Sequence, residues 1–386
     1  MADRAAFETA ARLFDRIDGL GHPLRGKPTG PDQPKRILIW TVDRIGDVVR
    51  GTLSVAALRR QFPHAEIVVV VANRALAVLA HNKAIDRIIT IASPHSLADQ
   101  RAGLAQLRGE HFDLGVLLEV EYFWVKLGQM WFRWLGVDRW ARFDHGLARH
   151  PRETLVPIDP AKGWDALFAD LAVAAGADAT GLRPTITLAD TAREGARKRL
   201  LQRGLDIEGP FLLCHPGTSA LVIDRSWEAE KFGAVIRELH RETGLRTIVT
   251  GLPAETPLAR TIVRVAGEPA AVDLTGLLSL EELMATIDAA DLLLINDTGP
   301  LHIANALATP AVAVLGPTAP SVLGLDPDLV TLVHSALPCQ PCAYHAGLKG
   351  CTNPEAYACL RAVTVEQVRD AALARLRRSP TRETAQ

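Results

Sequence analysis

A polar turn that directly follows an apolar run is the first place in this sequence where chemistry could occur. The apolar run is Asp291–Ile295, and the turn that follows it, Asn296–His302, reads N-D-T-G-P-L-H. A buried parallel strand that ends in such a turn and opens a helix places backbone N–H groups at the carboxyl edge of a sheet, where phosphate binds. The alternative is an ordinary helix cap made by Asp297 or Thr298.

A second turn of the same kind, His215–Ser219, follows the apolar residues Phe211–Cys214. Its glycine permits close approach of a ligand to the backbone, and Thr218 and Ser219 offer hydroxyl donors. Arg225, a few residues downstream, offers a planar cationic fork that suits a diphosphate. The alternative is a turn with only a structural role.

A carboxylate, Asp47, lies near the start of the first long predicted helix, Gly46–Gln61, which follows the predicted strand Arg36–Val42. In the first turn of a helix an aspartate either complements the helix dipole or, at the carboxyl edge of a parallel sheet, faces a ligand. The sequence has no G-x-G-x-x-G motif, so it lacks the fingerprint of a nicotinamide cofactor site.

Four of the five cysteines have the spacing C-x2-C-x8-C-x7-C: they are Cys339, Cys342, Cys351 and Cys359. A tetrahedral thiolate site needs one tight C-x2-C turn and two further ligands, which this spacing offers. Zinc and iron both accept four thiolates, so the spacing does not choose between them. The alternative is four reduced thiols that pack a loop.

Aromatic and basic side chains gather in residues 122–143, which hold four of the seven tryptophans. One interpretation is a helix that packs on a sheet while its arginines extend along the surface toward solvent. The other is a helix that binds an acceptor or lies on a membrane surface, because aromatic and basic residues suit an anionic glycolipid.

The elements that would position these residues alternate between strand and helix, which is typical of a parallel sheet covered on both faces. The predicted strands of the first half are Arg36–Val42, Glu66–Ala72, Arg87–Ile91 and Leu114–Val120. Those of the second half are Phe211–Cys214, Thr247–Thr250, Ala271–Leu274, Asp291–Asn296 and Ala311–Leu315. The pattern fades at residues 151–184, so the sequence predicts an α/β protein with two Rossmann-like, doubly wound domains that face a central cleft.

We expect the first domain at residues 1–188, beginning with an extended leader at 1–35. The second is expected at 189–364, with the four-cysteine loop at 339–359, and a helix and tail follow at 365–386. A chain of 386 residues is longer than one core of ordinary size requires, which also favours two domains.

Charge and hydropathy argue against several classes of protein. The 43 lysines and arginines balance the 44 aspartates and glutamates, so no long-range field attracts nucleic acid. No apolar run reaches the roughly 18 residues that span a bilayer, and the charged N-terminus lacks the apolar stretch of a secretory signal. We therefore expect a cytoplasmic protein with no nucleic-acid partner.

Taken together, in this order and in two halves, these stretches resemble glycosyltransferase family 9, the family of the ADP-heptose:lipopolysaccharide heptosyltransferases. The resemblance runs from about Arg36 to Val368. Its motifs are R-I-G-D-V-V at 44–49, H-P-G-T-S at 215–219, R-S-W at 225–227, G-L-P-A-E at 251–255, L-T-G-L-L-S-L-E-E-L at 274–283, N-D-T-G-P-L-H at 296–302 and G-P-T at 316–318. The combination is specific, whereas no single motif is.

The resemblance implies a GT-B fold with an acceptor-binding first domain and a second domain that binds a nucleotide-sugar. It implies that Asp47 is the general base and that Arg225, where the family commonly has lysine, neutralises the departing diphosphate. Glu255 matches the acid that binds the ribose, and Leu278 falls where the adenine packs. The substrate-binding residues implied in this way are Arg44, Gly46, Gly217, Thr218, Ser219, Glu255, Leu278, Asp297, Thr298, Gly299 and His302.

The implied activity is the inverting transfer of a heptose from ADP-heptose to a hydroxyl of a saccharide acceptor in the lipopolysaccharide inner core, with no cofactor required for catalysis. A heptosyltransferase with a protein or small-molecule glycoside acceptor is one alternative, because the acceptor domain carries no readable specificity code. A catalytically silent nucleotide-binding paralogue is another. A glycolipid acceptor and peripheral contact with the cytoplasmic face of the inner membrane follow from the membrane-surface interpretation of residues 122–143.

Overall fold

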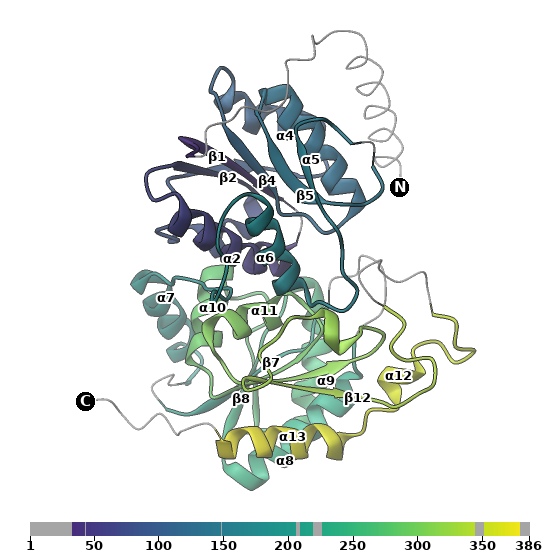
Figure 1. The fold of residues 1–386 in the computed structure, drawn as a ribbon. Coiled ribbons are helices and arrows are strands. Elements are labelled where there is room, and N and C mark those ends of the chain that lie inside the picture. Colours follow the sequence, from purple (N-terminus) through teal and green to yellow (C-terminus); the bar gives the residue numbers. More distant parts are fainter. Residues whose placement is uncertain are drawn as a thin grey trace. The chain divides into compact units, whose positions relative to one another are not determined.

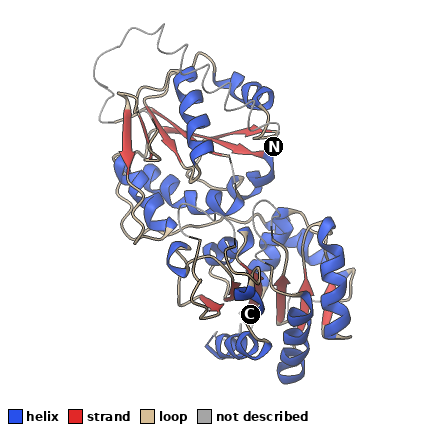
Figure 2. Cartoon of the chain, turned by 90° about the vertical axis from the view of Figure 1, so that its right-hand side faces the viewer, coloured by secondary structure: helices blue, strands red, loops and turns tan. Residues whose placement is uncertain are grey.

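The computed structural model describes residues 33–42, 44–147, 149–205, 209–218, 226–343 and 351–378. The chain forms two compact units. The first comprises the chain up to Asp159 together with Trp164–Thr185, and the second comprises Pro160–Gly163 together with the chain from Ile186 onward. Each unit is built on one six-stranded sheet, drawn in red among blue helices in Figure 2.

The sheet of the first unit is parallel throughout, in the order β3-β2-β1-β4-β5-β6. Its strands are β1 (Arg36–Thr41), β2 (Glu66–Ala72), β3 (Arg87–Ile91), β4 (Leu114–Leu117), β5 (Trp140–Phe143) and β6 (Glu153–Val156). The four successive valines of β2 are fully buried, as β-branched residues are in a sheet covered on both faces. The strand order reverses between β1 and β4, which makes this the switch point where ligands bind in such folds.

Helices cover both faces of this sheet. They are α2 (Ile45–Gln61), α3 (Leu76–Leu79), α4 (Leu97–Leu104), α5 (Tyr122–Leu135) and α6 (Trp164–Ala174), with single turns η1 (Asn73–Ala75) and η2 (Ala105–Leu107). Figure 1 shows α4 and α5 on one face of the sheet and α2 beside α6 on the other. The helix α5 packs into the core through Trp124, Trp131 and Phe132, in a buried cluster with Trp40 of β1.

The second unit repeats this plan, with all strands parallel in the order β12-β11-β10-β7-β8-β9. Its strands are β7 (Phe211–His215), β8 (Arg246–Val249), β9 (Ala271–Asp273), β10 (Leu292–Asn296), β11 (Ala311–Leu315) and β12 (Val330–His334). Here the order reverses between β7 and β10, so the switch point lies where the two polar turns singled out in the sequence leave the sheet.

The helices of the second unit are α7 (Asp190–Leu201), α8 (Ala229–Thr243), α9 (Thr256–Ala266), α10 (Leu280–Ala289), α11 (Gly299–Leu307), α12 (Ala358–Arg361) and α13 (Val365–Arg378), with turns η3 (Pro253–Glu255) and η4 (Pro320–Val322). The last helix, α13, packs against α8, β11 and β12 and therefore belongs to the core of this unit. Two Rossmann-like units confirm the predicted α/β fold class.

Residues 122–143 differ from the prediction of one aromatic, basic helix. The helix α5 stops at Leu135 because Gly136 adopts a left-handed conformation, with φ at 73°, which ends helices. The strand β5 then begins at Trp140. Arg142 in this strand has no exposed surface and pairs with Glu153 of β6 at 2.9 Å. For Arg142, therefore, the interpretation of an arginine extended toward solvent is wrong.

Three strands of the structure were not predicted, namely β5, β6 and β12. The strand β6 is only four residues long, and its exposed middle positions break the apolar run that indicates a buried strand. The strand β12 lies at the edge of its sheet, and three of its residues, Thr331, Leu332 and His334, are partly or fully exposed. Short, edge-proximal strands carry weak periodicity, so tertiary pairing decides them.

Candidate functional site

The carboxyl edge of the second sheet gathers turns from four neighbouring strands, β11, β10, β7 and β8. They are Gly316–Thr318 after β11, Asp297–Gly299 after β10, His215–Thr218 at the end of β7 and Gly251–Glu255 after β8. Because the strands are parallel, all four turns leave the sheet at the same edge. The structure thus brings together residues that are up to about a hundred positions apart in the sequence.

Asn296, the last residue of β10, joins two of these turns across the switch point. Its side-chain amide donates to the carbonyl of Pro216 at 2.7 Å, and its side-chain oxygen accepts from the backbone N–H of Trp227 at 3.1 Å. Asn296 has no exposed surface, so both bonds form in a low-dielectric interior, where losing either would be costly. The sequence motif contained this residue but gave no role to it.

Asp297 is buried and held by a residue from the next strand. The Thr318 hydroxyl donates to Asp297 Oδ2 at 2.6 Å, and the two residues are 7% and 6% exposed. Thr298 occupies the N-cap position of α11, but its side chain makes no capping hydrogen bond. The alternative of an ordinary side-chain cap by Thr298 is therefore wrong. Gly299 opens α11, and His302 is buried on the same helix.

Glu255, the last residue of the turn after β8, places its carboxylate against Gly217 in the turn at the end of β7. A Cβ atom added to Gly217 would lie 2.0 Å from a Glu255 carboxylate oxygen, and one added to Gly251 would lie 2.6 Å from the other. Only glycine fits at these two positions while the carboxylate keeps its place. The carboxylate accepts from the backbone N–H of Leu252 at 2.6 Å, and partial burial raises the pKa of Glu255.

The remaining donor-side predictions lie around these residues. Leu278 is partly buried in the turn after β9, which is tied to Gly251 by a hydrogen bond from the Gly276 N–H at 2.8 Å. The Thr218 hydroxyl forms a hydrogen bond of 2.8 Å with the Ser226 hydroxyl. Ser219 and Arg225 lie outside the described residues, and their roles stay predictions.

The carboxyl edge of the first sheet carries Asp47 at its own switch point. Asp47 is 3% exposed, and Arg50 Nη1, one turn further along α2, lies 2.7 Å from Asp47 Oδ1. The other carboxylate oxygen, Oδ2, is buried and makes no hydrogen bond within the described residues. A solvent-exposed aspartate that only complements the helix dipole would have neither feature.

Arg50 also approaches a second carboxylate, Asp165 at the start of α6. Arg50 Nε lies 3.6 Å from Asp165 Oδ1. Burial raises the pKa of Asp165 to about 7, against the opposing effect of the Arg50 charge. The i, i+3 spacing of Asp47 and Arg50 could have been recognised in the sequence, whereas Asp165 is brought near only by the packing of α6 on α2.

The turns beside Asp47 supply two further acids that sequence reasoning missed. Arg44, at the N-cap position of α2, forms an ion pair with Glu121, which follows β4. The buried Glu119 accepts a hydrogen bond from the backbone N–H of Val42. Gly46 is buried in the first turn of α2. The available signal was a pair of acids at the end of the predicted strand Leu114–Val120, namely Glu119 within it and Glu121 directly after it.

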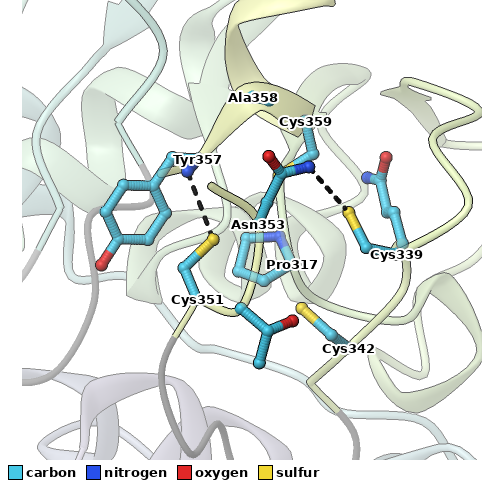
Figure 3. Close-up of a pocket in the computed structure, with 10 residues that line it drawn as sticks. Pro317, Cys339, Cys342, Cys351, Asn353, Tyr357, Ala358 and Cys359 are labelled. Carbon is cyan, nitrogen blue, oxygen red and sulfur yellow. Dashed lines mark hydrogen bonds between the residues drawn. The ribbon is translucent and has the colours of Figure 1, made fainter. Parts of the chain in front are cut away.

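The four cysteines line one small pocket, together with Pro317, Asn353 and Tyr357 (Figure 3). The cavity measures about 10 Å³, roughly the room that one water-sized sphere needs. Two sulfur atoms accept hydrogen bonds of 3.4 Å, Cys339 from the Asn353 side-chain amide and Cys351 from the Tyr357 backbone N–H. Burial and the neighbouring thiols raise the pKa values of Cys342 and Cys359.

The four sulfur atoms lie farther from one another than the ligands of a single metal ion do. Among the described residues, the group whose ligand atoms all lie within 4.8 Å of one another is His111, Asp113 and Asp138. That group is explained without a metal, because Asp113 accepts from the backbone N–H groups of Lys35 and Arg36 at 2.7 and 2.9 Å. To bind one ion the four thiols would have to approach one another.

The aromatic part of residues 122–143 is mostly buried. Trp124 and Trp131 are 3% and 6% exposed, whereas Tyr122 is 51% exposed at the start of α5. The indole of Trp131 also donates to the side-chain oxygen of the buried Gln100. These contacts agree with the core-helix interpretation of α5. No helix in the described ranges combines the length and apolarity needed to cross a membrane.

Comparison with known proteins adds independent findings. The chain matches the family model for glycosyltransferase family 9 (heptosyltransferase) over residues 145–351, more than half of its length. Lipopolysaccharide heptosyltransferase 3 of Escherichia coli is 24% identical over 282 residues, which cover 71% of this chain and 81% of that protein.

Solved structures share the fold. A glycosyl transferase family 9 protein from Veillonella parvula DSM 2008 has a TM-score of 0.73 and 22% identity, covering 89% of this chain and 98% of that one. The Escherichia coli ADP-heptose lps heptosyltransferase II has a TM-score of 0.70 and 17% identity, with 88% and 98% covered. The iron-containing dodecameric glycosyltransferase TibC from enterotoxigenic Escherichia coli H10407 has a TM-score of 0.58 and 14% identity, with 92% and 81% covered.

The predicted GT-B fold is confirmed by these structures. The family match covers the turns after β7, β8, β10 and β11 that form the site described above. The chain belongs to glycosyltransferase family 9 (heptosyltransferase), and it is a glycosyltransferase.

Proposed function

We propose that this protein is an inverting heptosyltransferase that moves a heptose from ADP-heptose to a hydroxyl of a saccharide acceptor in the lipopolysaccharide inner core. The observation that carries the proposal is the convergence of four turns at one sheet edge, with Glu255 against Gly217 and Asp297 held by Thr318. Support for the substrate class comes from the lipopolysaccharide heptosyltransferase of Escherichia coli that the chain matches over 71% of its length.

In this proposal the second unit binds the donor. Glu255 accepts from the ribose hydroxyls, because a carboxylate can accept from two donors at once, and Leu278 packs against the adenine. The diphosphate lies at the turn Asp297–Gly299, where the N-terminus of α11 offers N–H groups and positive charge. Thr218, Ser219 and Arg225 contact the phosphates, and Arg225 neutralises the charge that develops as ADP departs. His302 completes the set assigned to the donor.

The first unit binds the acceptor beside Arg44, Gly46 and Asp47. Arg50 holds Asp47 Oδ1 and so fixes the orientation of the carboxylate. We assign the acceptor proton to Asp47 Oδ2. As that proton leaves, the acceptor oxygen attacks the anomeric carbon, and the bond from this carbon to the ADP oxygen breaks with its electron pair on ADP. Attack opposite the leaving group inverts the anomeric centre.

The four cysteines fit a structural zinc or iron ion by the chemistry of their donors and by the pocket that they share. Such an ion would stabilise four thiolates and cross-link the cysteine loop. The N–H groups of Asn353 and Tyr357 already donate to two of the sulfurs, as outer partners of metal thiolates do. The transfer itself needs no cofactor, because Asp47 and Arg225 supply its base and its cation.

The proposal includes the place where the enzyme works. We propose a cytoplasmic location, with peripheral contact at the cytoplasmic face of the inner membrane. The exposed Tyr122 at the start of α5 is the side chain that would test such contact, since an aromatic ring at a headgroup boundary strengthens binding to vesicles.

Product analysis tests the proposed reaction. Purified protein is incubated with ADP-heptose, or with other nucleotide-sugars, and with delipidated core saccharides, and the products are identified by mass spectrometry. We expect transfer of one heptose from the ADP donor only. If heptose is transferred to a glycosylated peptide or a small glycoside and not to core saccharides, the acceptor is a protein or a small-molecule glycoside and not the lipopolysaccharide core. The absence of transfer with retained ADP binding would indicate a silent paralogue.

A further inference from the structure

The turn Gly316–Thr318 lies between the carboxylate of Asp297 and the pocket of the four cysteines. On one side the Thr318 hydroxyl donates to Asp297 Oδ2 at 2.6 Å. On the other side Pro317 lines the pocket of the four cysteines, and its ring lies among them in Figure 3. A turn only three residues long therefore connects the thiol pocket with the donor turn after β10.

Cys342, one of the first pair of cysteines, is hydrogen-bonded directly to this turn. The backbone N–H groups of Cys342 and Ala343 both donate to the Pro317 carbonyl at 2.9 Å, and the Ala319 N–H donates to the Ala343 carbonyl at 2.9 Å. The Gln340 side-chain amide donates to the Gly316 carbonyl at 2.5 Å. The segment that carries Cys342 thus holds the backbone on both sides of Thr318.

The last cysteine is connected to the same turn by packing. Leu360, next to Cys359 on α12, fills the space beside Gly316, where an added Cβ atom would lie 2.8 Å from Leu360 Cγ. Cys359 and Leu360 are buried in the core of the second unit. The position of Gly316–Thr318 is therefore defined by both ends of the four-cysteine loop and by β11.

We propose that Thr318 is a positioning residue for Asp297 and that the segments around Cys342 and Cys359 set the position of Thr318, so that the placement of these segments controls affinity for the nucleoside-diphosphate sugar. This inference rests on the proposed function, in which Asp297 belongs to the donor site. A carboxylate beside a diphosphate repels it unless the carboxylate is held toward the sugar hydroxyls. The hydrogen bond from Thr318 supplies that restraint.

Substitution of Thr318 tests the first part. Thr318→Val keeps the shape of the side chain but removes the hydroxyl donor. Thr318→Ala also removes the donor, and its side chain is smaller than that of threonine. We expect ADP and ADP-heptose to bind about tenfold more weakly to both variants by calorimetry, since a hydrogen bond to a charged group is lost. Thr318→Ser keeps the donor and should bind about as the wild type does.

Thr286→Val provides the matched control. Thr286 is fully buried in the same unit and donates to the Glu282 carbonyl within α10, away from the donor turns. This variant should lose some stability and keep its ADP affinity. If Thr318→Val and Thr318→Ala bind ADP as tightly as Thr286→Val does, Thr318 does not position Asp297 and the inference is wrong.

A double-mutant cycle tests the link to the cysteine loop. Cys342→Ser should weaken ADP binding in the wild-type background and add little in the Thr318→Val background, because both changes act through one connection. Elemental analysis of each variant shows whether a bound metal is lost at the same time. Equal weakening in both backgrounds would overturn the proposed route through Thr318. A wild-type protein that binds neither ADP nor ADP-heptose would overturn the proposed function itself.

Discussion

At the scale of single residues, this protein is organised around carboxylates that are buried and held in place. Asp47 is fixed by Arg50 and Asp297 by Thr318, at 2.7 and 2.6 Å. Glu255 is instead surrounded by two glycines that leave room for it. The charges of Asp47 and Asp297 would be costly to bury without such partners, which points to roles in binding and catalysis.

Replacing Asp47, the proposed base, gives the most direct prediction. Asp47→Asn preserves the shape of the side chain but cannot accept the acceptor proton. We expect kcat to fall by at least about 10²-fold, since general-base contributions are typically about 10²–10⁴-fold. The Kd of ADP, measured by calorimetry, should stay nearly unchanged. A variant with near-normal turnover would remove Asp47 from the mechanism.

The lack of a side chain at Gly217 leaves room for the Glu255 carboxylate, which gives a second prediction. A methyl group at this position would displace the flexible end of Glu255, whose carboxylate lies 2.0 Å from the added atom. We expect Gly217→Ala to weaken ADP binding about tenfold, as loss of the ribose contact should. The melting temperature should change little, because a flexible side-chain end can move away at low cost.

Gly195→Ala is the control for this change. A Cβ atom added to Gly195 in α7 also meets a glutamate, Glu282 at 3.1 Å, but no residue of the proposed site lies there. The helix position should gain up to about 1 kcal/mol of stability from alanine, with ADP affinity unchanged. Equal ADP affinity in Gly217→Ala and Gly195→Ala would argue against a ribose site at Glu255.

At the scale of elements, parallel strands decide which turns meet. The turns after β7 and β10 flank the switch point of the second sheet, and Asp47 follows β1 at the switch point of the first. The packing of α6 on α2 adds a group that no local pattern indicates, because it brings Asp165 within 3.6 Å of Arg50. Asp165 and Asp47 therefore share one cation, Arg50.

Asp165 makes stability depend on pH. Its pKa is raised to about 7, mainly by burial, so the folded protein binds this proton more tightly than the unfolded chain does. The stability that results is fully present below the unfolded pKa of about 4 and is lost as the pH rises to about 7. Among the charged groups on the elements that pack against α6, Arg50 acts on Asp165, whereas Arg142 and Glu153 pair with each other.

Asp165→Asn removes this ionisation, so the variant should lose less stability than the wild type between about pH 5 and about pH 8. The difference in the free energy of unfolding should be about 1–3 kcal/mol. It is smaller than the full change in pKa would give, because the Asp165 side chain is 19% exposed. Melting temperatures at constant ionic strength measure it. Asp170→Asn, on the same helix, controls for loss of an aspartate. Parallel pH profiles for Asp165→Asn and wild type would contradict the assignment.

At the scale of the whole molecule, the four-cysteine loop leads into a segment that packs in the core of the second unit. Cys359, Leu360 and Val363 are its anchors in the buried core, and Lys231 of α8 donates to the carbonyls of Arg361 and Val363 at 2.6 and 3.2 Å. A closed thiolate site would cross-link the two described ends of the loop.

Metal content tests this view. Protein purified without a metal-affinity column should contain about one equivalent of zinc or iron. Cys342→Ser should release the metal and lower the melting temperature. Cys214→Ala is the control, because Cys214 is a core cysteine on β7 whose loss should lower stability while the metal stays bound. If the wild-type protein contains no metal and all four thiols of the loop can be titrated, the cysteines bind no ion and only pack the loop.

The sequence by itself determined the fold class and the position of most candidate residues. Alternating apolar strands and helices predicted two Rossmann-like units, because strand and helix periodicity are local properties. The N-D-T-G and H-P-G-T turns were recognisable for the same reason, since each follows a buried strand. The boundaries of α5 and β5 were missed because a left-handed glycine and an edge pairing, and not composition, separate them.

Only the tertiary structure decided which groups touch. Thr318 on Asp297, Glu255 against Gly217 and Asp165 near Arg50 are contacts between residues that lie 21 to 115 positions apart. No pattern within one element specifies them, because they arise from the order of strands in a sheet and the packing of helices upon it. The sequence supplied the chemical groups, and the order of the parallel strands determined which of them act together.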